Sequence, residues 1–246
     1  PIEWTARMVG DNESHPAPSF VGAGIQNVFF HRNRLGLLTK HNAILSKTGS
    51  YYNFFRRSML VLLDDDPIDL GSLSKRVVDF HSTATHNKKL MALGTQEQLF
   101  LDSGNAPFTA KTAAFTQESQ CLTAPTDPCM AGSTVFFVSP RKDYVDIREY
   151  YIQPDTQSEE AANVTLHVPK YIKAGTISIA NCDSKDLLLV HTSAEPSQLI
   201  YHRYFWSGTE KAQNSWSTWD FGAPIWGLGI VGTTLHLLVL RADGVC

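Results

Sequence analysis

The sequence predicts an all-β fold, in the form of a β-propeller-like array of about five blade units. Apolar residues come in short runs rich in Val, Ile, Phe, Tyr and Thr, and Gly, Pro, Asn or Asp bound these runs. The runs form pairs across short polar turns, and the pairs recur about every 50 residues, which is typical of propeller blades. A large β-sandwich with evenly spaced hairpins is the alternative interpretation.

Each predicted pair is a hairpin in which two apolar runs flank a polar turn. The first strands begin near residues 34, 89, 134, 186 and 234, which sets the repeat. The predicted pairs are Arg34–Thr39 with Ala43–Ser46, Lys89–Leu93 with Gln98–Leu101, Thr134–Ser139 with Tyr144–Tyr151, and Asp186–His191 with Gln198–Phe205, while Thr234–Leu240 begins a fifth.

One more short strand is expected ahead of every pair, which gives the three or four strands of a blade. Helical periodicity is nearly absent, and only Thr156–Ala162, with its glutamates and alanines, is compatible with a short helix. The additional strands are predicted at Ile25–Phe30, Val77–His81, Pro128–Gly132, Thr176–Ala180 and Ile225–Ile230.

The repeat also predicts how the chain is organised. Residues 1–24 precede the first strand and form an N-terminal lead-in, and residues 25–246 form the propeller-like domain. The fifth unit reaches the turn Asp243-Gly244 without a return strand, and an open strand edge invites aggregation. Since the sequence also begins with Pro1 instead of Met, we expect it to be part of a longer polypeptide.

Composition excludes several classes of protein. The 246 residues are 43% hydrophobic and 18% charged, which is globular and neither disordered nor fibrous. A formal net charge of −3 disfavours a tight non-specific nucleic-acid binder. Four cysteines are too few for a disulfide scaffold. The N-terminus shows no signal peptide, and the longest apolar run, Leu235–Leu240, is far shorter than a membrane span.

No catalytic or cofactor motif occurs, so we expect neither an enzyme nor a bound cofactor. Cys121 and Cys129 have the wrong spacing for a zinc site and are expected to be reduced, half-buried thiols. The nine histidines are scattered without metal-ligand spacing. The run Asp64-Asp65-Asp66 could bind a hard cation through oxygen ligands. It lacks the pattern of a calcium loop, however, and Asp before Pro commonly starts a turn.

Two clusters of arginines are the densest basic features. Arg32 and Arg34 belong to the segment His31-Arg32-Asn33-Arg34, and Arg56 and Arg57 are adjacent. These four arginines are candidate contacts to a phosphate or to a neighbouring subunit. The alternative is that they lie in solvated turns between strands.

A glycan-binding or glycan-hydrolysing propeller is the alternative function. It would need a spaced pair of carboxylates at the propeller mouth, together with exposed aromatic rings. No such pair is evident from the sequence, and Trp219 is expected to pack inside a blade, so that Trp219→Ala would lose about 3–5 kcal/mol of stability. The candidates are the carboxylates Asp79, Asp102, Asp146 and Glu149 and the aromatic residues Tyr51, Tyr52, Trp206 and Trp216.

Four separated segments carry a family resemblance. They are Ser19–Leu38 (SFVGAGIQNVFFHRNRLGLL), Asp64–Asp69 (DDDPID), His167–Ile172 (HVPKYI) and Ser215–Gly222 (SWSTWDFG). Together and in this order, they resemble the tail tubular protein B, or tail nozzle protein, family of T7-like short-tailed bacteriophages. Members of that family are several times longer, so the sequence resembles a central portion.

The resemblance implies a structural protein of the virion, made in the host cytoplasm. Such a protein would be a nozzle subunit in a homo-oligomeric, hexameric ring that forms the distal DNA-ejection channel. Its partners would be the tail adaptor protein, the tail fibres and phage DNA that passes through without sequence-specific binding. A near-neutral chain suits such a conduit, because lysine-lined walls would hold DNA back.

Overall fold

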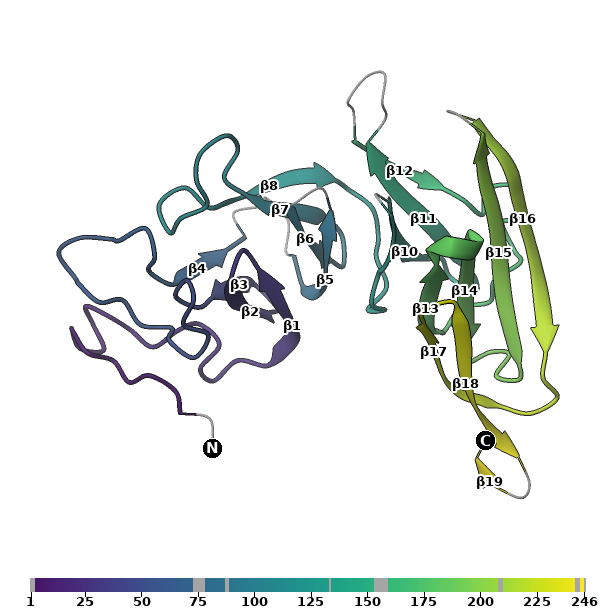
Figure 1. Cartoon of the computed structure of the whole chain (residues 1–246), viewed down its shortest axis with the longest axis horizontal. Helices are drawn as coiled ribbons and strands as arrows, with labels where there is room; N and C mark the ends of the chain where they lie inside the picture. The colour runs from purple at the N-terminus through teal and green to yellow at the C-terminus, as the bar shows by residue number, and fades with distance from the viewer. Residues whose placement is uncertain are drawn as a thin grey trace. The chain divides into compact units, whose positions relative to one another are not determined.

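The computed structural model describes residues 3–72, 78–86, 89–132, 134–152, 159–207, 210–241 and 244–245. Within these ranges the regular structure consists of strands β1 to β19 and one short 3₁₀ helix, η1 (Asp183–Lys185). The strands form five small antiparallel sheets in which consecutive strands are neighbours (Figure 1). The predicted all-β array is therefore confirmed. None of the described residues forms a helix long and apolar enough to cross a membrane.

The chain divides into two compact units, Pro1–Leu122 (the N-terminal unit) and Thr123–Cys246 (the C-terminal unit). The predicted division at residue 24 stays a prediction about the domain organisation. The N-terminal unit holds sheet 1, with β1 (Ile25–His31), β2 (Arg34–Thr39), β3 (Asn42–Leu45) and β4 (Ile68–Gly71), and sheet 2, with β5 (Phe80–His86), β6 (Lys89–Gly94), β7 (Gln98–Asp102) and β8 (Ala114–Ser119).

The C-terminal unit holds the other three sheets. Sheet 3 contains β9 (Cys129–Ala131), β10 (Thr134–Pro140), β11 (Val145–Ile152) and β12 (Glu159–Asn163). Sheet 4 contains β13 (Thr176–Cys182), β14 (Leu187–Thr192), β15 (Gln198–Ser207) and β16 (Glu210–Asp220). Sheet 5 contains β17 (Ile225–Val231), β18 (Thr234–Arg241) and β19 (Gly244–Val245).

The predicted hairpins are confirmed as β2–β3, β6–β7, β10–β11 and β14–β15. Two local predictions are wrong. The strand expected at Val77–His81 begins only at Phe80, because β5 buries the small or polar residues Ser82, Ala84 and His86 and so lacks a strong apolar signal; Val77 itself lies outside the described residues.

The helix expected at Thr156–Ala162 is the other error. Residues 159–163 form β12, since pairing with β11 outweighs their helical propensity, and residues 156–158 lie outside the described part.

The core of the N-terminal unit lies between sheets 1 and 2. Leu38 and Leu45 from sheet 1 are fully buried in one cluster with Leu90 of sheet 2. Phe29 of β1 pairs with Gly36 of β2, and a β-carbon at Gly36 would lie only 2.1 Å from the Phe29 ring. Glycine at this position therefore lets the aromatic ring lie flat over β2 and complete the core.

The opposite face of sheet 1 is covered by irregular chain. Leu35, Leu37 and Ile44 are buried there beneath Phe54, with Phe20 of the lead-in packed against them. Ser19 anchors the lead-in to β4, because its N–H and hydroxyl donate to the Asp69 carboxylate at 2.9 and 2.6 Å.

The C-terminal unit buries both faces of sheet 4. On one face, Phe136 and Ile147 of sheet 3 pack with Val190 and Ile200. On the other face, Leu189 and Leu199 of sheet 4 pack with Ile225 of sheet 5. Sheet 4 is therefore the central layer of this unit.

Strands β15 and β16 extend beyond β14 as a two-stranded ribbon (Figure 1). The last pair between β14 and β15 is Leu187 with Arg203, whereas β15 and β16 stay paired to their connecting turn. Lys211 on this ribbon forms an ion pair with Glu149 of β11, and both side chains are nearly buried. The same ammonium lies 5.0 Å from the ring centre of Trp206, so the ribbon is fastened to sheet 3.

Candidate interaction site

Arg32 lies in the two-residue turn between β1 and β2. Arg32 and Asn33 have positive φ angles of 47° and 60°, as tight hairpin turns require. Contacts to Asn33 hold this uncommon conformation: the Tyr51 hydroxyl donates to its side-chain oxygen at 2.7 Å, and the Gly49 N–H donates to its carbonyl at 3.0 Å. The exposed Arg32 guanidinium lies 5.6 Å from the centre of the Phe108 ring.

Arg34 is buried and has an internal role. Its guanidinium donates to the carbonyl oxygens of Ser46 at 2.8 Å, Asp66 at 2.6 Å and Asp64 at 3.1 Å. Burial lowers the pKa of Arg34 below its usual value, and the nearby carboxylates of Asp65 and Asp66 act in the opposite direction. The side chain clamps the loop between β3 and β4 and is only 1% exposed. Its predicted contact to a phosphate or a neighbouring subunit stays a prediction.

Arg56 and Arg57 lie on this same loop and are exposed. The loop continues into three exposed apolar side chains, Met59, Leu60 and Val61, and Leu60 is 95% exposed. The cations and the apolar side chains therefore share one protruding segment of the N-terminal unit.

The aspartates of the acidic run face different partners. Lys111 pairs with Asp64 at 3.3 Å and Lys47 pairs with Asp65 at 2.8 Å. The fully buried Asp66 accepts the N–H of Leu63 at 2.8 Å. The hydrogen bond from Lys47 holds the pKa of Asp65 below its usual value. These contacts order the loop, and across the described ranges no group of three potential ligands is arranged for a metal ion.

The four candidate carboxylates each face a cationic or titratable side chain of their own unit. Asp146 and Glu149 are three residues apart on β11, so they point to opposite faces of the sheet. These two residues therefore do not form a pair of facing carboxylates for glycoside hydrolysis. The partners are His41 for Asp79 at 3.7 Å, Lys89 for Asp102 at 3.8 Å, Arg141 for Asp146 at 2.6 Å, and Lys211 for Glu149.

The candidate aromatic residues are divided between the two compact units. Tyr51 and Tyr52 belong to the N-terminal unit and are 37% and 40% exposed, and Tyr52 packs edge-on against Trp4 at 5.5 Å. Trp206 lies on β15 and Trp216 on β16 of the C-terminal unit. Each ring is thus used within its own unit.

Burial favours the neutral form of three titratable groups, two histidines and one cysteine. His202 bonds to Asn214 at 2.7 Å and stacks on Trp216 at 4.5 Å, and burial lowers the pKa of His202 to about 4. Burial also lowers the pKa of His31 to about 4 and raises the pKa of the Cys129 thiol to about 12. Cys121, Cys129 and Cys182 form no disulfide, and Cys246 lies outside the described residues.

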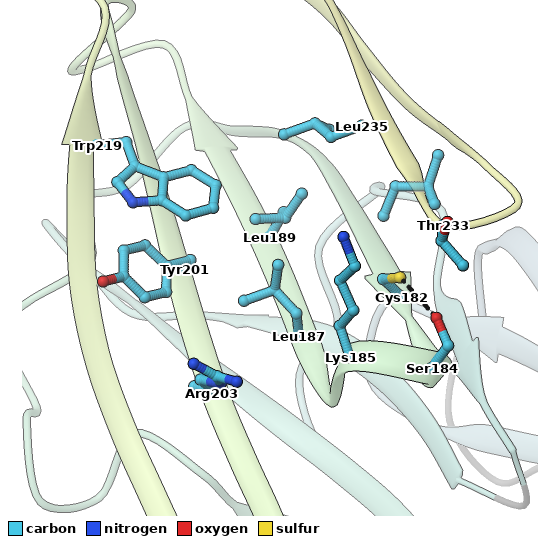
Figure 2. A pocket seen from close by; sticks show the side chains of 11 residues that line it. Cys182, Ser184, Lys185, Leu187, Leu189, Tyr201, Arg203, Trp219, Thr233 and Leu235 are labelled. Atoms are coloured by element: carbon cyan, nitrogen blue, oxygen red, sulfur yellow. Dashed lines mark hydrogen bonds between the residues drawn. The ribbon is translucent and has the colours of Figure 1, made fainter.

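A groove that the sequence did not suggest lies on the face of sheet 4 that sheet 5 covers only in part (Figure 2). Its volume is about 450 Å³. We call it the sheet-4 groove. Its floor is formed by Leu187 and Leu189, its wall on one side by Tyr201 and Trp219, and its other side by the β17–β18 hairpin and Cys182.

Two exposed cations flank the floor of the sheet-4 groove. Arg203 is the cross-strand partner of Leu187, and Lys185 ends η1 just before β14. The Tyr201 and Trp219 rings lie with centres 4.5 Å apart. Alternation along β15 would have placed Tyr201 and Arg203 on one face. No local pattern reveals that the β17–β18 hairpin forms the opposite side of the groove.

The whole chain, residues 1–246, matches the family model of the bacteriophage nozzle protein. The chain belongs to the bacteriophage nozzle protein family. The tail tubular protein gp12 of Escherichia phage T7 is 34% identical to it over 226 residues, which cover 91% of the chain. The chain spans 28% of the length of that relative. The resemblance carried by the four sequence segments is therefore confirmed.

Among solved structures, this nozzle-family chain is similar in fold to a chain in the complex of the Nup170 N-terminal domain with Nup53 from Chaetomium thermophilum. The TM-score is 0.54 with 12% sequence identity, and the match covers 94% of the chain and 37% of that structure. A likeness at this identity concerns the fold alone.

Proposed function

We propose that the chain is a structural, non-enzymatic part of the nozzle of a short-tailed phage. In this role it acts as a rigid β scaffold within a subunit of a hexameric ring that encloses the distal DNA-ejection channel. The ring contacts the tail adaptor protein and the tail fibres, and it resides in the virion after synthesis in the host cytoplasm. The family match over the full chain is the observation that carries this proposal.

The charge distribution supports a passive conduit. Several cations are committed to internal contacts, as Arg34 is to carbonyl groups and Lys211 is to Glu149. The formal net charge of the chain is −3. A net negative charge disfavours a tight grip on phosphates, so that DNA can pass without sequence-specific binding.

The exposed arginines of the N-terminal unit are the proposed subunit or phosphate contacts. Arg56 and Arg57 sit beside the protruding Leu60, and this combination of cations and an apolar side chain suits a protein partner better than a phosphate backbone. Arg32 presents a third exposed guanidinium.

Electron microscopy of the full-length protein tests the proposal. We expect sixfold rings around a channel wide enough for duplex DNA, and fewer rings for the double variant Arg56→Ala/Arg57→Ala. The exposed Lys170→Ala serves as a matched control that leaves assembly unchanged. A full-length protein that remains monomeric at high concentration would contradict the ring.

A further inference from the structure

We infer that the sheet-4 groove binds a short peptide segment of another protein, one that combines acidic and aliphatic side chains. The inference rests on the proposed function only in that the phage tail supplies the partner. The groove is distinct from the arginines of the N-terminal unit, and three properties support it: length, charge and the nature of its walls.

The length of the groove fits an extended peptide. It reaches from Trp219 on β16, across β15 and β14, to Cys182 at the end of β13. Three spacings between neighbouring strands amount to about 14 Å. About four residues of extended chain span this distance. The groove thus has the reach of a short linear segment, and Trp219 at one end of it is 39% exposed (Figure 2).

The groove carries two cations, Lys185 and Arg203, and aspartates lie close to Lys185 on both sides in the sequence. Lys173 and Arg141 of the same unit have carboxylate partners at 2.7 and 2.6 Å, as Lys211 also has. In contrast, Lys185 and Arg203 are exposed and form no ion pair with any described residue. An Arg guanidinium fork binds carboxylates in a bidentate manner, so an acidic occupant is the complementary one.

The walls of the groove are apolar and aromatic. They therefore favour a peptide in which an apolar side chain lies next to an acidic one. Leu187 lies between Cys182 and Arg203 in the sheet and is half-buried, whereas Leu189, two residues later, is fully buried at the bottom of the groove. The Tyr201–Trp219 ring pair adds a broad aromatic surface, and partly exposed aromatic rings are common anchors of protein partners. Aliphatic side chains of a bound peptide would contact this floor. The carboxylates of the neighbouring peptide residues would then lie near Lys185 and Arg203.

Binding of a defined probe tests the inference. We would measure fluorescence anisotropy of a labelled peptide of alternating glutamate and leucine with the full-length protein, and compare its glutamine–leucine counterpart. We expect binding of the acidic peptide to weaken about three- to tenfold for Arg203→Gln and for Lys185→Gln. Lys170→Gln, an exposed cation outside the groove, is the matched control and should bind as the parent protein does.

The aromatic wall has its own matched pair of variants. Trp219→Ala should weaken binding about tenfold, whereas Trp226→Ala, on the 69% exposed tryptophan of β17 outside the groove, should not. Circular dichroism of each variant establishes that it is folded. Equal binding of the acidic and the neutral peptide, or equal losses for groove and control variants, would overturn the inference.

Cross-linking in assembled tails identifies the partner. A photo-reactive residue in place of Thr233, which lines the groove, should link to a segment rich in acidic and aliphatic residues. Links to a basic segment, or only to glycan or lipid, would overturn the inference. Rings that form normally while the groove binds no acidic peptide would refute the groove alone, and a protein absent from tails would refute the proposed function instead.

Discussion

The two compact units form their cores alike, between consecutive antiparallel sheets, but they treat their outer faces differently. In the N-terminal unit, the face of sheet 1 turned away from sheet 2 is sealed by the lead-in and the β3–β4 loop through Phe20 and Phe54. In the C-terminal unit, sheet 5 covers only part of sheet 4 and presents Trp226 and Leu238, which are 69% and 57% exposed. The sealed face is a structural feature, and the open face is available to a partner.

The units also differ in how they use a buried cation. Arg34 of the N-terminal unit is held by three backbone carbonyls of the loop that it clamps. Lys211 of the C-terminal unit is held by a carboxylate on a neighbouring sheet. Removal of Arg34 leaves three carbonyl groups without this donor and takes a cation away from the nearby Asp65 and Asp66 carboxylates, whereas removal of Lys211 leaves the Glu149 carboxylate without its ion-pair partner.

The largest effect is expected for Arg34→Ala, with a loss of about 3–5 kcal/mol, because three carbonyls lose their donor and the β3–β4 loop loses its clamp. Urea unfolding monitored by fluorescence measures the loss. Arg34→Lys should restore only part of the stability, since an ammonium cannot reproduce the planar fork. The exposed Arg32→Ala is the control, and an equal loss for both variants would show that Arg34 is not a clamp.

A somewhat smaller loss, about 2–4 kcal/mol, is expected for Lys211→Met, because Glu149 then remains buried and unpaired. The double variant Lys211→Met/Glu149→Leu should recover much of this stability, since it removes both charges. Thermal unfolding of the two variants makes the comparison. A double variant less stable than the single one would mean that the ion pair itself is strongly stabilising.

Acidic pH should lower the stability of both units, because each unit contains a buried histidine. The pKa values of His31 and His202 are lowered to about 4 by burial, so between about pH 6.5 and 4 the unfolded chain binds more protons than the folded one. Stability is therefore complete above about pH 6.5 and falls toward pH 4, by on the order of 1–3 kcal/mol for each histidine.

Urea midpoints between pH 7 and 4.5 measure this dependence. His202→Gln should make it shallower, whereas His41→Gln, at an exposed histidine, should not. A midpoint that stays constant over this range for the parent protein would contradict the burial of both histidines as neutral groups.

Most of the strands could be predicted because their signal is local. Sheets begin at Ile25, Phe80, Cys129, Thr176 and Ile225, which preserves the predicted repeat. The fourth strand of each complete sheet was missed, since these outer strands are polar and half exposed. The sequence Glu159–Asn163 is an example, because only pairing with β11 makes it a strand.

The interaction surfaces were less predictable because they depend on distant partners. Arg32 and Arg34 are two residues apart, yet one is exposed and the other buried beneath a loop some 30 residues downstream. The sheet-4 groove is formed by residues of six strands, β13 to β18, and of η1. Neither the burial of Arg34 nor the sheet-4 groove can be predicted from a short stretch of sequence.

The smallest effect on stability is expected for Trp219→Ala, and it sharpens the contrast between sealed and open faces. The sequence predicted a buried tryptophan and a large loss, but Trp219 is 39% exposed and packs mainly on Tyr201. The expected loss is therefore only about 1–2 kcal/mol, measured by urea unfolding. Phe54→Ala, on the sealed face of sheet 1, should lose about 3–5 kcal/mol. Equal losses would mean that the sheet-4 groove is as much a part of the core as the sealed face is.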